Sequence, residues 1–217
     1  MNRIYNSLLI VLLLLQCLYI PSCKQEKETN DWPSERLQNW LDYYDLSMED
    51  FDEKDRFDRA YRVIYEFSLS EDDMYAPLYI YSEDSSRAID IDSYHLVLER
   101  TDKGELFSPG READMEAALI DLNKGVRKRL LFCGPSCVFE EAGFHPGGHV
   151  FVAGFAESET AYYPVIWYID EDNGYIVIER ASERDLPAAK IRYIPDRRLS
   201  GVIFWHQPEG LHLDVPL

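Results

Sequence analysis

Short apolar runs separated by turn sequences recur along most of the chain. In the first of them, Tyr61, Val63 and Tyr65 alternate with polar residues, which is the two-residue period of a half-buried β-strand. Similar runs follow at residues 78–81, 88–91, 95–98, 118–122, 129–132, 150–155, 165–169, 175–178, 191–194 and 202–205. Because sequences rich in Gly, Pro, Asp and Ser separate these runs, the pattern predicts a mainly β, mainly antiparallel protein.

The segment that precedes these runs, residues 31–58, has a helical pattern instead. Asp31 can cap a helix that carries Pro33 in its first turn. The apolar residues that follow have helical spacing: Leu37, Trp40, Leu41 and Tyr44. Ser47, with Asp50 three residues later, predicts the start of a second short helical piece, because a serine oxygen can accept a hydrogen bond from a free backbone N–H there. We therefore expect one or two helices before the strands.

A weak internal repeat relates parts of the β region. ALIDLNKG at 118–125 aligns with WYIDEDNG at 167–174, and FHPGGHVFVAGF at 144–155 aligns with YIPDRRLSGVIF at 193–204. A third unit, at 79–92, fits if the polar insert 101–114 is looped out.

Such units resemble the blades of β-propellers. A closed propeller needs at least four blades of roughly 40 residues, for which the chain is barely long enough. We therefore predict an open, twisted antiparallel sheet or a sandwich, built from blade-like meanders.

The first residues have the order of an export signal. Arg3 precedes an apolar run at 8–20, and a polar stretch begins at Lys24. This run is too short to cross comfortably a hydrocarbon layer about 30 Å thick. We therefore predict that residues 1–22 are a signal peptide and not a permanent membrane-spanning helix.

The end of this leader, Ile20-Pro21-Ser22-Cys23, resembles the lipobox of bacterial lipoprotein precursors. The resemblance implies that Cys23 becomes the acylated N-terminus and carries fatty chains such as palmitate. Cys17 is a competing candidate, although Gln16 is a poor residue before the cut. By the same resemblance, Lys24 after the cysteine implies the outer membrane. The alternative is a secreted protein with an incidental cysteine.

The length of the mature chain indicates its domain organisation, and its charge limits the classes of partner that it can bind. We expect residues 23–30 to be a short tether and residues 31–217 to be one β-rich domain. The chain has a formal net charge of −18. Because such a field repels phosphate backbones and anionic lipid surfaces, nucleic acid is excluded as a partner, and contact with the membrane is expected from the lipid anchor alone.

Cys133 and Cys137 flank the turn sequence Gly-Pro-Ser in a compartment that permits disulfides. Two residues that face each other across a hairpin lie close enough for a disulfide, which is our prediction; two free thiols are the alternative. A redox role like that of the thioredoxin CGPC motif is not favoured, because Ser136 is inserted and the following residues do not predict a helix.

The same stretch suggests a zinc site formed by Cys133, Cys137, His145 and His149. Its spacing does not fit a zinc finger, and His145-Pro-Gly-Gly-His149 has the sequence of a turn, so we predict no metal site. The acidic runs lack the glycine and glutamate of a calcium-binding EF-hand loop. They are better explained as a solvated acidic face, with a type I′-like hairpin turn at Asn173-Gly174.

No motif for catalysis is present. The sequence has no G-x-S-x-G elbow, no H-E-x-x-H and no glycine-rich phosphate loop. Glu140 and Glu141 are neighbours in a predicted strand, so we expect them on opposite faces, unable to act together on one bond. We predict no catalytic residue and no cofactor.

The 15 tyrosines and 4 tryptophans favour a recognition surface. We therefore predict a lipid-anchored cell-envelope protein that binds a protein or glycan partner or has a structural role, without catalysis. The alternative is an envelope hydrolase or carbohydrate-processing accessory protein, whose site would use scattered acids and His145 or His149. A pocket with convergent carboxylates would favour this alternative, and a flat tyrosine-rich face would favour binding.

Overall fold

The computed structural model describes residues 33–58, 63–145, 148–157, 159, 161–181 and 184–205. The predicted signal peptide, Cys23 and the tether lie outside these ranges and stay predictions. Chain contacts separate Met1–Asp31 from a compact unit, Trp32–Leu217, to which every description below refers. Within the described ranges, no helix has the length and apolarity that a membrane crossing requires.

The described residues of this unit form three sheets, and the predicted mainly β, mainly antiparallel class is confirmed. The first sheet contains, in spatial order, β1 (Asp52–Asp58), β12 (Tyr175–Arg180), β11 (Tyr162–Asp170), β10 (Val150–Glu157) and β9 (Cys137–Phe144). The second contains β2 (Ile64–Glu66), β8 (Val126–Cys133), β7 (Met115–Asp121), β4 (Arg87–Asp90) and β3 (Ile80–Tyr81). The third contains β13 (Ile203–Phe204), β6 (Leu106–Arg111) and β5 (Leu96–Arg100), with β13 parallel to β6.

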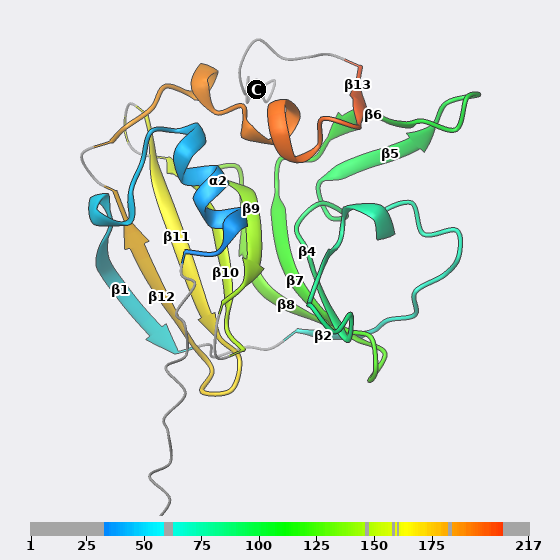
Figure 1. The fold of residues 1–217 in the computed structure, drawn as a ribbon, viewed down its shortest axis with the longest axis horizontal. Helices are drawn as coiled ribbons and strands as arrows, with labels where there is room; N and C mark the ends of the chain where they lie inside the picture. The colour runs from blue at the N-terminus through cyan, green and yellow to red at the C-terminus, as the bar shows by residue number, and fades with distance from the viewer. Residues whose placement is uncertain are drawn as a thin grey trace, which may run out of the picture. The chain divides into compact units, whose positions relative to one another are not determined.

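Strands β9, β10 and β11 of the first sheet are buried on both faces. Along β10, Val150 and Val152 pack in a core that also contains residues of the second sheet. Phe151 and Phe155 point to the opposite face and pack with the helix α2 (Glu35–Tyr43), which crosses this face in Figure 1. A strand covered on both faces has a nearly continuous apolar sequence, which explains the run at 150–155.

Helix α2 presents the predicted face to this sheet. Leu37, Trp40 and Leu41 are buried, as predicted. Ser34 caps the helix, and its Oγ accepts a hydrogen bond from the N–H of Leu37 at 3.4 Å, so the predicted start at Asp31 is wrong.

The second predicted helical piece is a single 3₁₀ turn, η1 (Met48–Asp50). It has a reciprocal cap, in which Asp50 accepts a hydrogen bond from the N–H of Ser47 at 2.7 Å. The predicted start at Ser47 is therefore confirmed.

Two predicted boundaries near the sheet edges are wrong. The helical segment 31–58 ends early, because Asp52–Asp58 form the edge strand β1, whose partner is β12. The polar insert 101–114 contains β6, which pairs with β5. Both strands lack a strong apolar alternation because few of their side chains enter a core.

Two predicted strands also differ from the structure. Residues 191–194 do not form a strand; the 3₁₀ turn η3 (Ala188–Lys190) precedes them, and the π-helical turn η4 (Ile194–Arg198) begins at the last of them. The 3₁₀ turn η2 (Ala76–Leu78) shortens the run at 78–81 to β3. The first run retains only β2, whose three residues are exposed at a sheet edge, and residues 59–62 lie outside the described ranges.

The internal repeat is confirmed in one half. Residues 118–125 and 167–174 each end a strand and form the following turn, and Asp121 and Asp170 each accept a hydrogen bond from the N–H three residues later, at 3.0 and 2.8 Å. Asp90 does the same after β4, at 3.0 Å. In the other half, 144–155 forms the β9–β10 hairpin, whereas 193–204 contains η4 and β13, so that alignment is wrong.

The predicted type I′ turn at Asn173-Gly174 is also wrong. That turn needs a positive φ at both central residues. Gly174 has φ of 72°, but Asn173 is not in the left-handed region.

Candidate functional site

Glu140 and Glu141 lie on the same side of β9, so the prediction that they face opposite ways is wrong. Across β10, Phe139 pairs with Gly154 and Glu141 pairs with Ala153, which leaves Glu140 as an extra residue in the strand. An extra residue of this kind is a β-bulge, and it interrupts the alternation of side chains. Both carboxylates therefore reach partners on the α2 side of the sheet.

Gly154 makes this bulge possible. A Cβ atom at this position would collide with the carbonyl oxygen of Val138 in the neighbouring strand. Only glycine lets the two backbones approach so closely. The bulge at Glu140 therefore depends on a glycine at position 154.

The Glu140 carboxylate is buried among neutral hydrogen-bond donors. Trp40 Nε1 donates to Glu140 Oε2 at 3.0 Å, and Tyr44 Oη donates to the same oxygen at 2.7 Å. Among the described residues, Glu140 Oε1 has no hydrogen-bond partner. Burial raises the pKa of Glu140 to about 7, although the hydrogen bonds from Tyr44 and Trp40 act in the opposite direction.

The Glu141 carboxylate has one charged partner. Arg36 Nη1 donates to Glu141 Oε1 at 2.8 Å, and Tyr193 Oη donates to Oε2 at 3.0 Å. Arg36 lies in α2, and Tyr193 comes directly before η4. Glu141 therefore joins the helix, the strand and the C-terminal turn.

Arg198 completes the arrangement from η4. Its two terminal nitrogens donate to Asp92 at 2.6 and 2.7 Å, and its Nε donates to the backbone oxygen of Glu140 at 2.6 Å. The side chains of Arg198 and Asp92 are 5% and 1% exposed, so this is a buried ion pair. We call the following residues the α2 network: Arg36, Trp40, Tyr44, Asp92, Glu140, Glu141, Tyr193 and Arg198.

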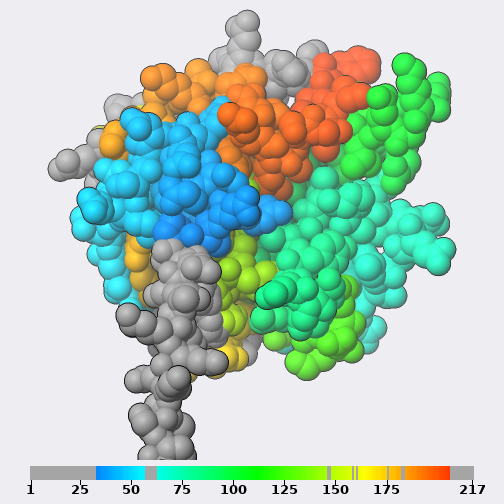
Figure 2. Space-filling model, in the orientation of Figure 1, coloured from blue at the N-terminus to red at the C-terminus, as the bar shows by residue number. Residues whose placement is uncertain are grey.

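A cavity of about 770 Å³ lies beside the α2 network. One face of α2, residues 77–80, Glu141 and the η4 region line it. In Figure 2 the blue surface of α2 adjoins the orange surface around η4, where Tyr43 Oη also donates to Asp196 at 2.6 Å. Residues from four distant parts of the sequence therefore form one wall.

The charges that line the cavity balance. The carboxylates are Glu35, Asp42 and Glu141, and the guanidinium groups are Arg36, Arg197 and Arg198. The chain as a whole has a net charge of −18, so this neutral region differs from the average surface. A ligand with both hydrogen-bond donors and acceptors suits such a wall better than a strongly charged one.

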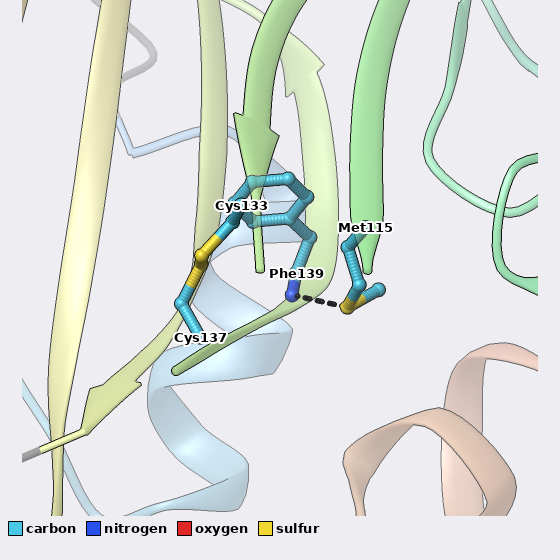
Figure 3. Close-up of a disulfide and its surroundings, with 4 residues drawn as sticks. All are labelled: Met115, Cys133, Cys137 and Phe139. Atoms are coloured by element: carbon cyan, nitrogen blue, oxygen red, sulfur yellow. Dashed lines mark hydrogen bonds between the residues drawn. A yellow bond between two sulfur atoms is a disulfide. The ribbon is translucent and has the colours of Figure 1, made fainter. Parts of the chain in front are cut away.

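The predicted disulfide between Cys133 and Cys137 is confirmed. Their Cα atoms are 6.1 Å apart, and the bridge joins the end of β8 to the start of β9. Figure 3 shows the ring of Phe139 beside Cys133, with the Phe139 N–H directed at the sulfur of Met115 at 3.2 Å. The bridge therefore lies against the core and supports a structural role.

The structure separates the cysteines from the histidines. Cys137 begins β9, whereas His145 follows its last residue, so a strand of eight residues, about 25 Å long, lies between them. The disulfide also uses both thiols. The four-ligand zinc set considered from the sequence therefore cannot form. In the described ranges, no group of three or more His, Cys, Asp or Glu residues is arranged to hold a metal ion.

Sequence reasoning missed most of the α2 network. Asp92, Tyr193 and Arg198 were not singled out, and Trp40 and Tyr44 were expected only as an apolar face. One signal was present: two adjacent glutamates interrupt the apolar run at 137–144, opposite a strand that contains a glycine. An acidic pair in a buried strand needs partners, and here they come from α2 and η4.

Comparisons with family models, with curated proteins and with solved structures give no match to this chain. A proposal for its function therefore rests on the cavity and on the residues around it.

Proposed function

We propose that this chain is a lipid-anchored cell-envelope protein that binds a polar, uncharged ligand, an oligosaccharide, in the cavity beside α2 and does not catalyse a reaction on it. The observation that carries the proposal is the cavity of about 770 Å³, whose polar wall is held by buried partners. Binding sites are typically concave and largely formed before the ligand arrives.

The chemistry of the wall supports a ligand rich in hydroxyl groups. Arg36, Asn39 and Arg197 offer donors, and Asp42 and Glu141 offer acceptors. A hydroxyl group both donates and accepts, so a sugar can satisfy both kinds of group without introducing a net charge. Because Glu141 and Arg36 already hold each other at 2.8 Å, little side-chain ordering would remain to be done on binding.

The proposed lipid anchor would hold the binding site close to ligands of the envelope. The lipobox-like leader supports acylation at Cys23, and α2 begins at Glu35, only a short tether later. A tethered domain meets ligands fixed to the same envelope at a raised effective concentration.

The anchor can be tested by mass spectrometry of the protein from its native membranes. We expect a mature chain that begins at Cys23 with attached acyl chains. Cys23→Ser should leave the leader in place and prevent acylation. An unmodified Cys23 in the wild-type protein would refute this part of the proposal.

The cavity can be tested with two tryptophan substitutions. Asn39 lines the cavity, whereas Glu49 in the nearby turn η1 is exposed and does not, so Asn39→Trp fills the cavity and Glu49→Trp is the control. The probe is chitotetraose, an uncharged oligomer of N-acetylglucosamine, and binding is measured by calorimetry. We expect binding by the wild type and by the control, with at least about tenfold weaker binding by Asn39→Trp. No binding by the wild type, or equal effects of both variants, would overturn the proposed ligand.

One observation favours the alternative, an envelope hydrolase. The carboxyl groups of Glu140 and Glu141 are neighbours, Glu141 lines the cavity, and burial raises the pKa of Glu140 to about 7, which suits a general acid. Glu140 does not line the cavity, however, and both groups are engaged by α2 and Tyr193. If the wild type cleaves chitotetraose and Glu141→Gln does not, the hydrolase is correct; an oligomer left intact by the wild type rejects it.

A further inference from the structure

His145 and His149 face each other at the far end of β9. They extend the β9–β10 pairing by one step beyond Phe144 and Val150, and the N–H of His145 donates to the backbone oxygen of His149 at 2.8 Å. Their ring centres are 6.0 Å apart. The hairpin therefore holds two imidazole rings next to each other on a rigid pair of strands.

This separation is close to that of two rings on one metal ion. A metal–nitrogen bond of about 2.0–2.1 Å with tetrahedral angles places two ring centres about 5 Å apart. A small rotation about the side-chain bonds would close the remaining gap. Imidazole is a preferred ligand for zinc, copper and nickel, whereas calcium and magnesium prefer oxygen.

The surroundings of the two rings also favour a cation. Both line a small cavity of about 290 Å³ together with Glu53, Asp170 and Glu179. Among the described lining residues, these three carboxylates outnumber the guanidinium of Arg56, which already pairs with Glu53 at 3.4 Å. This differs from the balanced wall of the cavity beside α2 and would attract a positive ion.

Asp170 is placed to orient one of the ligands. Its Oδ2 atom lies 3.6 Å from Nδ1 of His149, and its side chain is 3% exposed. This separation is longer than a hydrogen bond. A small turn of the His149 ring would bring Nδ1–H onto the carboxylate and leave Nε2 directed away from it, which is a common arrangement behind metal-binding histidines. Asp170 itself is fixed by Asn173, whose backbone N–H donates to it at 2.8 Å.

We propose that His145 and His149 bind one divalent copper, nickel or zinc ion, with Asp170 orienting His149 and with water completing the coordination. Two protein ligands agree with the absence of a three-ligand group in the described ranges. Copper should bind most tightly, following the general order of affinities for nitrogen sites. This site is independent of the ligand proposed for the cavity beside α2.

The test uses the purified mature protein in detergent and Cu²⁺ as the probe, with calorimetry for affinity and electron paramagnetic resonance for the ligands. We expect one equivalent to bind with two nitrogen ligands. Loss of a residue that hydrogen-bonds to a metal ligand typically weakens metal binding roughly 10- to 100-fold. His145→Gln and His149→Gln each remove a direct ligand, so each should weaken copper binding by at least that factor. Both positions are only partly buried at a hairpin, so the variants should fold, which circular dichroism can verify.

A matched control comes from the same chain. His206 and His212 lie outside the described residues, and replacing both by glutamine should leave the copper affinity and the nitrogen signal unchanged. Binding that survives His145→Gln and His149→Gln, or that disappears with the control variant, would overturn the proposal. A spectrum without two nitrogen ligands in the wild type would overturn it as well.

Discussion

Two buried carboxylate clusters, one on each five-stranded sheet, are compensated in different ways. On the second sheet, Glu116 accepts hydrogen bonds from Arg127, at 2.7 Å, and from Arg129, and Arg127 also pairs with Asp90 at 2.7 Å. On the first sheet, Glu140 accepts hydrogen bonds from the neutral groups of Trp40 and Tyr44. In the Glu116 cluster, arginines neutralise the buried carboxylates. In the Glu140 cluster, no cation among the described residues is hydrogen-bonded to the carboxylate oxygens of Glu140.

The two clusters also connect different elements of the fold. Cross-strand ion pairs at Glu116 join neighbouring strands of one sheet, and their arginines stay partly exposed, which lowers the desolvation cost. The hydrogen-bond donors to Glu140 come from the α2 side, so Glu140 joins this helix to the first sheet. The same helix forms part of the cavity wall. We infer that the Glu140 cluster responds to pH and the Glu116 cluster holds strand register.

The largest expected effect follows from removing an arginine. Arg198→Met would leave Asp92 buried without its ion-pair partner and should lower the free energy of unfolding by about 4 kcal/mol. Arg129→Met should cost less, because Glu116 retains Arg127. Urea denaturation of both variants measures the difference, and equal losses would contradict the contrast between the clusters.

A second substitution tests whether the bulge is needed for the Glu140 cluster. Gly154→Ala places a methyl group against the carbonyl oxygen of Val138 and should destabilise the fold by about 3 kcal/mol. Gly201→Ala is the control, because a Cβ there would meet no atom within 4 Å. Thermal unfolding of the two variants should show a large shift for the first and little change for the second.

The dependence of stability on pH gives the third prediction. Glu140 has a pKa of about 7 in the folded chain, above its ordinary value of 4.5, so between these values the folded state holds a proton that the unfolded state has lost. This group therefore stabilises the fold fully below about pH 4.5 and loses that contribution, roughly 3 kcal/mol, as pH rises through 7.

Glu140→Gln removes this loss, so the variant should gain stability relative to the wild type between pH 5 and pH 8. Glu116→Gln should instead be less stable than the wild type at pH 8, because its arginines lose a charged partner. Denaturation at both pH values gives the comparison. Changes of the same sign at pH 8 would show that the two clusters do not differ as proposed.

The smallest expected effect concerns the disulfide. Replacing Cys133 and Cys137 by serine should cost about 2 kcal/mol, because the bridge closes a short loop. The bridge is at the opposite end of β9 from the histidine hairpin, so copper affinity should not change. A loss of copper binding in this variant would mean that the two ends of β9 are coupled.

Local sequence patterns predicted the features that depend on neighbours along the chain. The buried face of α2, the strands β7, β10 and β11, and the disulfide at Gly-Pro-Ser all follow from spacings within a few residues. The first turn of the repeat was predicted for the same reason, because Asp121 and Asp170 cap their own turns.

The candidate site depends on contacts that no local pattern contains. The bulge at Glu140 arises from the register between β9 and β10 and from Gly154, whereas strict alternation predicts Glu140 and Glu141 on opposite faces. Trp40, Asp92 and Arg198 come together only after three separate segments have packed. The edge strand β1 was missed because its acidic sequence takes its strand conformation from pairing with β12.

That pairing has a consequence for how the protein can be made. β1 lies near the beginning of the described chain and β12 near its end, yet Asp52 pairs with Arg180 and Asp58 with Tyr175. Contacts between such distant segments form slowly, because closing the long loop between them costs conformational entropy before the contacts stabilise the fold. During synthesis the acidic segment of β1 is therefore made well before β12 and stays without its strand partner until β12 has emerged.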